Sequence, residues 1–383
     1  MTRSVERLVW VALSGLSLAV EPVVGQNRIG VSPGFAEILG GVYGEVYSIA
    51  AFGVTGRPDV SVRFKVTGIF SGGTPVSPNL IVASPSIGTT PATIFVGPDP
   101  NVTRKMAPGR YEAVISLTTV DQTPPATTSA FVTLTLRAPP PPNIGAVVNT
   151  ASLQPVVSPG SMVTIFGTSL GPPVFSAEYD STGLYPTRFV DTTVTFNGIV
   201  APLLYMSPGQ INAVAPYRLA GQRTAEVVVA HYGQTSPAFS VPVTDTSPAI
   251  FTASQGRGGQ GAILNVPANP SDLTAYSFNS GDNPAAPGSA ISLFVTGFGV
   301  WDDTVPDASI SITARSFRAK PVSLSIGGQP ATILYAGAAP YQTMGMLQVN
   351  ALVPPNAASG PQPLVLAIGQ TDNAQQQVTI AVK

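Results

Sequence analysis

One motif in this chain has the residue spacing of a nucleophilic enzyme. Residues 167–171 read Gly-Thr-Ser-Leu-Gly, which matches the G-x-S-x-G elbow of α/β-hydrolases. Asp180 or Asp191, followed by His231, would complete the chain order of their triad. The elbow needs a helix that begins directly after the serine, and Pro172-Pro173 opposes one there. We therefore expect a strand end at this position and no catalytic residue.

Two further patterns have the residue types of cofactor and metal sites. Residues 256–261 match G-x-G-x-x-G, but a dinucleotide site needs a following helix, whereas residues 262–267 indicate a short strand that ends at Pro267. His231 is the single histidine and is expected in an exposed turn, and the chain has no cysteine, so imidazole and thiolate zinc sites lack ligands. Asp282 and the carboxylates of 302–307 lack the fixed spacing of a calcium loop. We expect no cofactor and no metal.

Amide and aromatic side chains on strands are the better candidates for binding. Gln210 and Asn212 are two residues apart, so they share one face of a strand, and Gln348 and Asn350 repeat the pattern. Side-chain amides beside an aromatic ring can bind a sugar or a peptide edge. The alternative is that these groups only pack on the core and keep an edge soluble. The candidate binding residues are Tyr205, Gln210, Asn212, Trp301, Tyr335, Gln348 and Asn350.

The composition restricts the partners and the fold that would position these residues. Only 10% of the 383 residues are charged and the formal net charge is −1, so no electrostatic patch for nucleic acid is expected. The 38 glycines and 39 prolines separate apolar segments, which is typical of turns between many short strands. Residues 60–67 and 132–137 alternate apolar and polar side chains with the period of a half-buried strand.

The start of the chain has the layout of an export signal. Arg3 and Arg7 precede an uncharged stretch from Leu8 to Val20, and small residues follow before Gln26. A helix of this length spans about 20 Å, which is too short for a bilayer core of about 30 Å. We expect residues 1–26 to be removed, no membrane span afterwards, and a secreted or cell-surface protein.

The rest of the chain divides into a first β region, a proline linker and a duplication. Pro-Gly-Ser at 159–161 returns at 287–289, and Gln-Ile-Asn-Ala at 210–213 returns as Gln-Val-Asn-Ala at 348–351. Asn197-Gly198 and Gly327-Gly328 each suit a two-residue hairpin turn. The expected domains are 27–137, a linker at 138–143, a first copy at 144–245, a glycine-rich connector at 246–270 and a second copy at 271–383.

These motifs resemble known families. Pro-Gly-Ser before an apolar strand, Gly-Thr-Ser-Leu-Gly, the Asn-Gly hairpin, an Ala-Pro strand end and a late Gly-Gln-Thr-Ser turn resemble the IPT/TIG immunoglobulin-like fold. More narrowly, 144–383 looks like the duplicated C-terminal domain of secreted acidobacterial proteins. Residues 83–96 and 107–111 make 27–137 similar to BACON domains, although the tryptophan common before their Ser-Pro is absent from 78–83.

Together, these observations predict an all-β chain of three tandem immunoglobulin-like antiparallel β-sandwiches. The expected function is non-catalytic adhesion or ligand binding outside the cell, with an extracellular polysaccharide or an envelope protein as partner. A structural spacer or surface-layer element without a ligand is the alternative, and an unrecognised secreted hydrolase is the third hypothesis.

Overall fold

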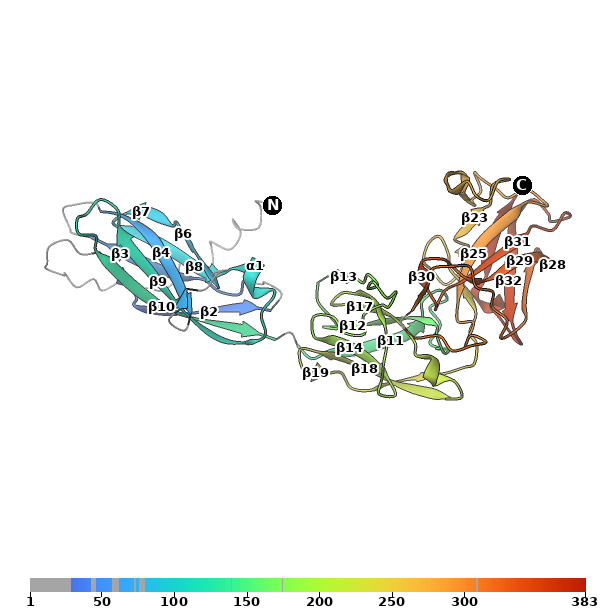
Figure 1. Ribbon diagram of the computed structural model, residues 1–383, viewed down its shortest axis with the longest axis horizontal. Coiled ribbons are helices and arrows are strands. Elements are labelled where there is room, and N and C mark those ends of the chain that lie inside the picture. Colours follow the sequence, from blue (N-terminus) through green and yellow to red (C-terminus); the bar gives the residue numbers. More distant parts are fainter. Residues whose placement is uncertain are drawn as a thin grey trace. The chain divides into compact units, whose positions relative to one another are not determined.

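The structure is a computed structural model that describes residues 29–42, 46–56, 62–71, 74–75, 80–138, 140–173, 175–307 and 309–383. The predicted fold class is confirmed, because the described chain consists of antiparallel β-sandwiches in tandem (Figure 1). The predicted export signal lies outside the described residues. Within the described ranges, no helix has the length and apolarity needed to cross a membrane. The chain divides into two compact units between Arg137 and Ala138, where the proline linker begins.

The N-terminal unit is one sandwich of two sheets. Its first sheet has the order β1 (Gly30–Ser32), β3 (Ala50–Thr55), β8 (Ala92–Pro98), β6 (Ile81–Ser84). Its second sheet has the order β2 (Phe35–Gly41), β10 (Thr127–Arg137), β9 (Gly109–Thr119), β4 (Arg63–Ser71), β5 (Thr74–Pro75), with β7 (Ile87–Thr89) also paired to β4. A single helical turn, α1 (Pro100–Thr103), follows β8 and is capped by Asp99. The β2–β10 pair is parallel.

The alternation predicted for this unit is visible in its core. Val132, Leu134 and Leu136 on β10 are buried, as is Phe64 on β4. Of the residues between the three β10 side chains, Thr135 is partly exposed and Thr133 is buried. A strand with one face on the core and one in water requires this period of two.

The first copy forms the second sandwich. One sheet has the order β11 (Asn143–Asn149), β12 (Met162–Thr168), β17 (Gln210–Val214), β16 (Leu203–Met206), β13 (Phe175–Ser176). The other has the order β15 (Ile199–Val200), β14 (Thr192–Phe196), β18 (Thr224–His231), β19 (Gln234–Thr235), with β20 (Phe239–Pro242) paired to β18. A short 3-10 turn, η1 (Tyr217–Leu219), follows β17. The predicted hairpin turn is confirmed, because Asn197 and Gly198 both have positive φ, at 49° and 76°.

The second copy forms the third sandwich with the same plan. One sheet has the order β24 (Ser277–Phe278), β23 (Ile263–Asn265), β25 (Ala290–Thr296), β31 (Leu347–Leu352), β29 (Thr332–Ala338), with β21 (Ala249–Ile250) paired to β25. The other has the order β22 (Gly259–Gln260), β34 (Val378–Val382), β32 (Gly360–Ile368), β27 (Val322–Ile326), β28 (Gln329–Pro330), with β33 (Thr371–Asp372) paired to β32. A small pair, β26 (Ile310–Ser311) with β30 (Gln342–Thr343), and two 3-10 turns, η2 (Leu273–Ala275) and η3 (Ala374–Gln376), complete it.

Residues 246–270, predicted to be a glycine-rich connector, are part of the third sandwich. They contain β21, β22 and β23, all of which pair with strands of the third sandwich. The glycines here allow close packing, since a Cβ on Gly258 would lie 2.3 Å from the backbone oxygen of Gln376. β23 lies in the stretch that the sequence predicts as a short strand ending at Pro267, whereas β21 and β22, of two residues each, are too short to show a period of two.

The two C-terminal sandwiches are joined by buried polar contacts. The Tyr217 hydroxyl, which follows the strand end of the first copy, donates to the Met344 backbone oxygen at 3.0 Å and accepts from Trp301 Nε1 at 3.1 Å. Burial raises the pKa of Tyr217 well above its ordinary value, so the hydroxyl stays protonated. On the other side of the junction, Gln376 Nε2 donates to the Ala151 oxygen at 3.0 Å. These bonds fix one copy against the other.

A glycine of the duplicated Pro-Gly-Ser motif makes room for this contact. Gly160 has φ +74°, and a Cβ there would lie 2.1 Å from Cε1 of Tyr217. Its counterpart Gly288 also has positive φ, at +80°, but nothing lies within 4 Å of its Cβ position. The turn therefore requires glycine in both copies, and the packing of Tyr217 requires it only in the first.

Candidate ligand-binding site

The structure places the predicted amide residues of the first copy on the outer face of one sheet. Asn212 on β17 lies opposite Tyr205 on β16, and Gln210 lies opposite Phe166 on β12. All four side chains are at least partly exposed, whereas Ile211 points into the core and is fully buried. We call these four residues, Tyr205, Phe166, Gln210 and Asn212, the first amide face.

The second copy repeats the arrangement on the same register positions. Asn350 on β31 lies opposite Tyr335 on β29, and Gln348 lies opposite Phe294 on β25. Tyr335, Phe294, Gln348 and Asn350 form the second amide face, whose strands β25, β31 and β29 are drawn in orange and red in Figure 1. Six of the seven predicted binding residues are thus gathered in two equivalent groups.

A β-bulge brings each tyrosine to its outer face. The register shifts between Leu203 and Tyr205 in the first copy, and between Ile333 and Tyr335 in the second. On a regular strand Leu203 and Tyr205, two residues apart, would point to the same face. The extra residue of the bulge lets Leu203 point into the core while Tyr205 stays partly exposed. Such bulges recur beside binding sites, where they redirect a side chain.

The amide pairs are held in the same orientation in both copies. Gln210 Nε2 donates to Asn212 Oδ1 at 2.9 Å, and Gln348 Nε2 donates to Asn350 Oδ1 at 2.9 Å. Each asparagine keeps its NH₂ donors and each glutamine its carbonyl oxygen for further bonds. A neutral surface with ordered donors and acceptors beside aromatic rings results.

The second amide face differs from the first in two ways. In the first copy Thr164 Oγ1 donates to Asn212 Oδ1 at 3.2 Å, whereas the corresponding Ser292 Oγ is buried and makes no hydrogen bond within the described part of the chain. In addition, the N–H of Phe251 donates to the oxygen of Phe294, at the place where the first copy has Ala146 opposite Phe166. The second copy therefore has an additional aromatic residue beside its face, and within the described residues its asparagine lacks the strand hydroxyl bond that Asn212 accepts.

A cavity of about 390 Å³ opens beside the second amide face. Phe251, Phe294 and Gln348 line it together with Ala339, Pro340, Gln342 and Met346. The cavity therefore combines two phenyl rings with two side-chain amides, the residue types that the sequence predicts for a binding site. Phe251 lay in the segment expected to be a connector, so the pattern gave no reason to include it.

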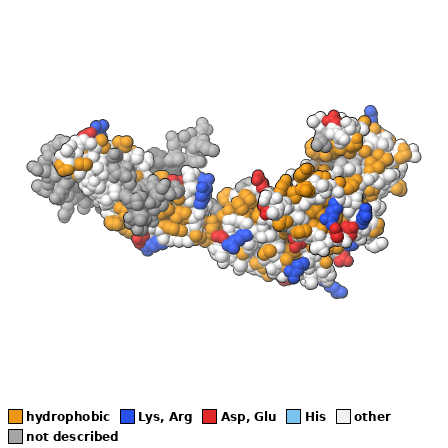
Figure 2. Space-filling model, viewed as in Figure 1, with side chains coloured by type: hydrophobic (Ala, Val, Ile, Leu, Met, Phe, Trp, Pro, Cys, Tyr) orange, Lys and Arg blue, Asp and Glu red, His pale blue; other side chains and the backbone are white. Residues whose placement is uncertain are grey.

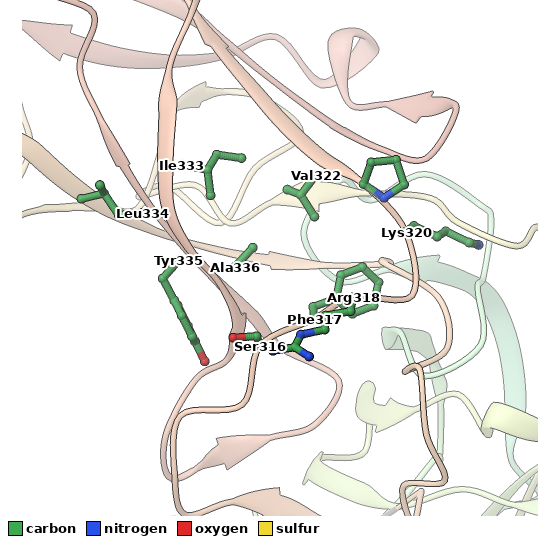
Figure 3. Close-up of a pocket in the computed structure, with 10 residues that line it drawn as sticks. Ser316, Phe317, Arg318, Lys320, Val322, Ile333, Leu334, Tyr335 and Ala336 are labelled. Carbon is green, nitrogen blue, oxygen red and sulfur yellow. The ribbon is translucent and has the colours of Figure 1, made fainter.

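A second, shallower cleft of about 440 Å³ is lined by Tyr335 and by residues of 316–322 and 333–336. Figure 3 shows Ile333 and Val322 as its apolar part, Ser316 and Arg318 near the Tyr335 side, and Lys320 at the far end. The Tyr335 hydroxyl itself donates to the Ala338 oxygen at 2.8 Å and accepts from the Arg315 N–H at 3.1 Å. These bonds therefore hold the Tyr335 side chain in place where the second amide face meets the cleft.

Trp301 does not join the other six predicted residues. Its ring is 5% exposed and packs edge-on against Phe298 and Phe317, with centroids 5.4 and 5.5 Å away. Its Nε1–H donates to Tyr217 and to the Met344 oxygen at the junction of the two copies. The residue is in a loop, as expected, but the loop folds inward, so the ring supports the core and has no exposed surface for a ligand.

The prediction for His231 was wrong. The residue is the last of β18 and is fully buried, with Nδ1 2.7 Å from Thr192 Oγ1. Burial lowers its pKa to about 4, so the ring is neutral at pH 7. The turn that follows begins one residue later, at Tyr232, which has φ 47°.

The remaining chemical motifs are placed as follows. Ser169 has positive φ, at 55°, and no helix follows it among the described residues 170–173. Gly259 and Gln260 of the G-x-G-x-x-G sequence form β22, which pairs with β34 and has no helix after it. Among the described residues no three His, Asp or Glu side chains are grouped as metal ligands would be.

The sequence reasoning missed an aromatic pair on the N-terminal sandwich. Phe35 on β2 and Phe131 on β10 lie directly opposite each other and are 50% and 59% exposed. The signal was available, because Phe131 falls in the polar phase of the alternation with Thr133 and Thr135.

Figure 2 shows charged side chains sparsely distributed among apolar and polar ones on the visible face.

No family model and no curated protein sequence matches this chain. Among solved structures, the chain is similar to the Bacteroides ovatus mixed-linkage glucan utilization locus protein SGBP-B in complex with a mixed-linkage heptasaccharide, at 14% identity and a TM-score of 0.28 over 94% of this chain and 71% of that one. It is also similar to the E. coli chaperone DraB, at 12% identity and a TM-score of 0.21 over 57% of this chain and 97% of that one. Likeness this low says nothing about what this chain binds.

Proposed function

We propose that this protein is an exported, non-catalytic protein that binds polysaccharide through its two amide faces. The observation that carries the proposal is the repetition itself. Four side chains of the same types occupy the same register positions in both copies, with the same amide–amide hydrogen bond. Within this proposal, 144–383 is an IPT/TIG-like duplication and 27–137 is a BACON-like module.

Polysaccharide is the partner that suits these groups best. Sugar rings present apolar C–H surfaces and neutral hydroxyls, which match aromatic rings and side-chain amides respectively. The faces carry no ionised group of their own among the eight residues that define them. An envelope protein that adds an edge strand would be recognised mainly by backbone groups and would not need paired amides.

The surrounding structure supports a binding role over simple packing. The core-facing residues of β17 and β31 are fully buried, so the amides are not needed to complete the core. Ser292 Oγ, opposite Asn350, is buried and makes no hydrogen bond within the described residues, so it does not hold Asn350 as Thr164 Oγ1 holds Asn212.

The test is binding to an array of plant and microbial polysaccharides, followed by affinity electrophoresis with the best ligand. Gln348→Ala combined with Gln210→Ala should weaken binding about tenfold or more, since each removes a preorganised hydrogen-bonding pair. Tyr179→Ala is the matched control, because Tyr179 is an exposed aromatic residue in the loop after β13. Silence across the whole array would refute the proposal and leave the spacer or surface-layer function.

The non-catalytic part of the proposal has its own test. Ester or glycan hydrolysis by the purified protein that disappears in Ser169→Ala would contradict it.

A further inference from the structure

The cleft beside Tyr335 contains two cations that the proposed function does not use. Arg318 and Lys320 line it together with Ser316, and no carboxylate is among its lining residues. Neither cation forms an ion pair within the described ranges, whereas the nearby Arg315 is paired with Asp303. In a chain that is only 10% charged, two cations without an ion pair therefore line the same cleft.

We propose, on the basis of the proposed function, that this cleft binds the carboxylate of a uronic-acid residue in the polysaccharide that crosses the second amide face. Tyr335 borders both sites, so a sugar chain that passes over Asn350 and Tyr335 continues into the cleft. Arg318 is the principal group, because its guanidinium lies on the Tyr335 side of the cleft (Figure 3). Lys320, at the other end, supplies a second positive charge.

The chemistry of the cleft fits a carboxylate on a sugar. A guanidinium presents a planar fork of donors that matches the two carboxylate oxygens. The apolar side chains Val322, Ile333 and Ala336 reduce local screening and offer a surface for the C–H face of the ring. The exposed Ser316 and the open side of the cleft leave space for a polymer that continues beyond it.

The first copy lacks this feature and so provides an internal control. Arg188 holds the same position before the Asn197-Gly198 turn that Arg318 holds before Gly327-Gly328, but it is paired with Asp191 at 2.5 Å. The following Lys320 corresponds to Val190. Selectivity for an acidic polymer therefore belongs to the second copy alone.

The experiment compares polygalacturonate with its carboxyl-reduced form and with a neutral mixed-linkage glucan, using isothermal titration calorimetry on the full protein. Arg318→Gln should weaken polygalacturonate binding about tenfold or more and leave the neutral polymers unchanged. Arg318→Lys, which keeps the charge without the fork, should recover part of the loss. Arg188→Gln should have no effect. Thermal unfolding of each variant confirms that the fold is intact.

Three outcomes would overturn the uronate site. These are unchanged binding in Arg318→Gln, equal affinity for native and carboxyl-reduced polymer, or equal affinity for dextran sulfate, which would indicate unspecific anion attraction. If any of these occurs while Gln348→Ala combined with Gln210→Ala still weakens binding to neutral glucan, the amide-face proposal stands and only the uronate site fails.

Discussion

Replacing the glycine of each Pro-Gly-Ser motif by alanine should have unequal effects in the two copies. Gly160 and Gly288 both have positive φ, so alanine costs about 1–2 kcal/mol at either position. Only at Gly160 does the new methyl meet a neighbour, the Tyr217 ring at 2.1 Å. The ring cannot retreat without breaking its hydrogen bonds to Met344 and Trp301. Overpacking of this kind costs a further 1–3 kcal/mol or so.

The expected result is a loss of about 1 kcal/mol for Gly288→Ala and about 3 kcal/mol for Gly160→Ala. Urea unfolding measures both, with fluorescence as the probe, because Trp301 is the only tryptophan once residues 1–26 are removed. A double-mutant cycle with Tyr217→Ala isolates the steric part, since the excess cost at Gly160 should vanish once the ring is gone. Equal losses at the two glycines, or an excess that survives Tyr217→Ala, would refute this account of the junction.

Two further predictions concern buried groups. Acidification should destabilise the protein between pH 6.5 and about 4, because His231 is neutral when folded and binds a proton only when unfolded in that interval. The limiting loss is about 3 kcal/mol, complete below the folded pKa. The proton NMR signal of the single imidazole measures the pKa of His231 in the folded protein. His231→Gln should remove the pH dependence, and a titration midpoint near 6.5 would contradict burial as its cause. Gly337→Ala should lower the thermal midpoint and move Tyr335, because its Cβ would lie 2.4 Å from the tyrosine hydroxyl and 2.2 Å from the Arg315 oxygen. An unchanged midpoint together with unchanged polysaccharide binding would show that Tyr335 is not fixed as described.

The fold class followed from the sequence because its signals are local. Alternation at 132–137 and the Asn-Gly and Gly-Gly turns depend only on neighbouring residues, and both are confirmed. The sharing of one face by Gln210 and Asn212 is also a local consequence of strand geometry.

What the sequence did not predict depends on contacts between distant residues. Trp301 is buried because Tyr217 of the other copy closes over its Nε1 side, and no local pattern contains that information. His231 is the last residue of an alternating strand and precedes Tyr232-Gly233, so its burial depends on the partner strand that carries Thr192. The cleft at Arg318 likewise forms from two segments, 316–322 and 333–336, that meet only in the fold.

The buried junction between the two copies has a consequence for avidity. Tyr217 and Gln376 hold the two copies together, so the two amide faces are kept at a fixed spacing. A polymer bound to one face can therefore bind the other without the entropy cost of ordering a flexible linker between the copies. Occupation of one copy then raises the local concentration of polymer at the other. Long chains should accordingly dissociate much more slowly than oligomers that reach only one copy.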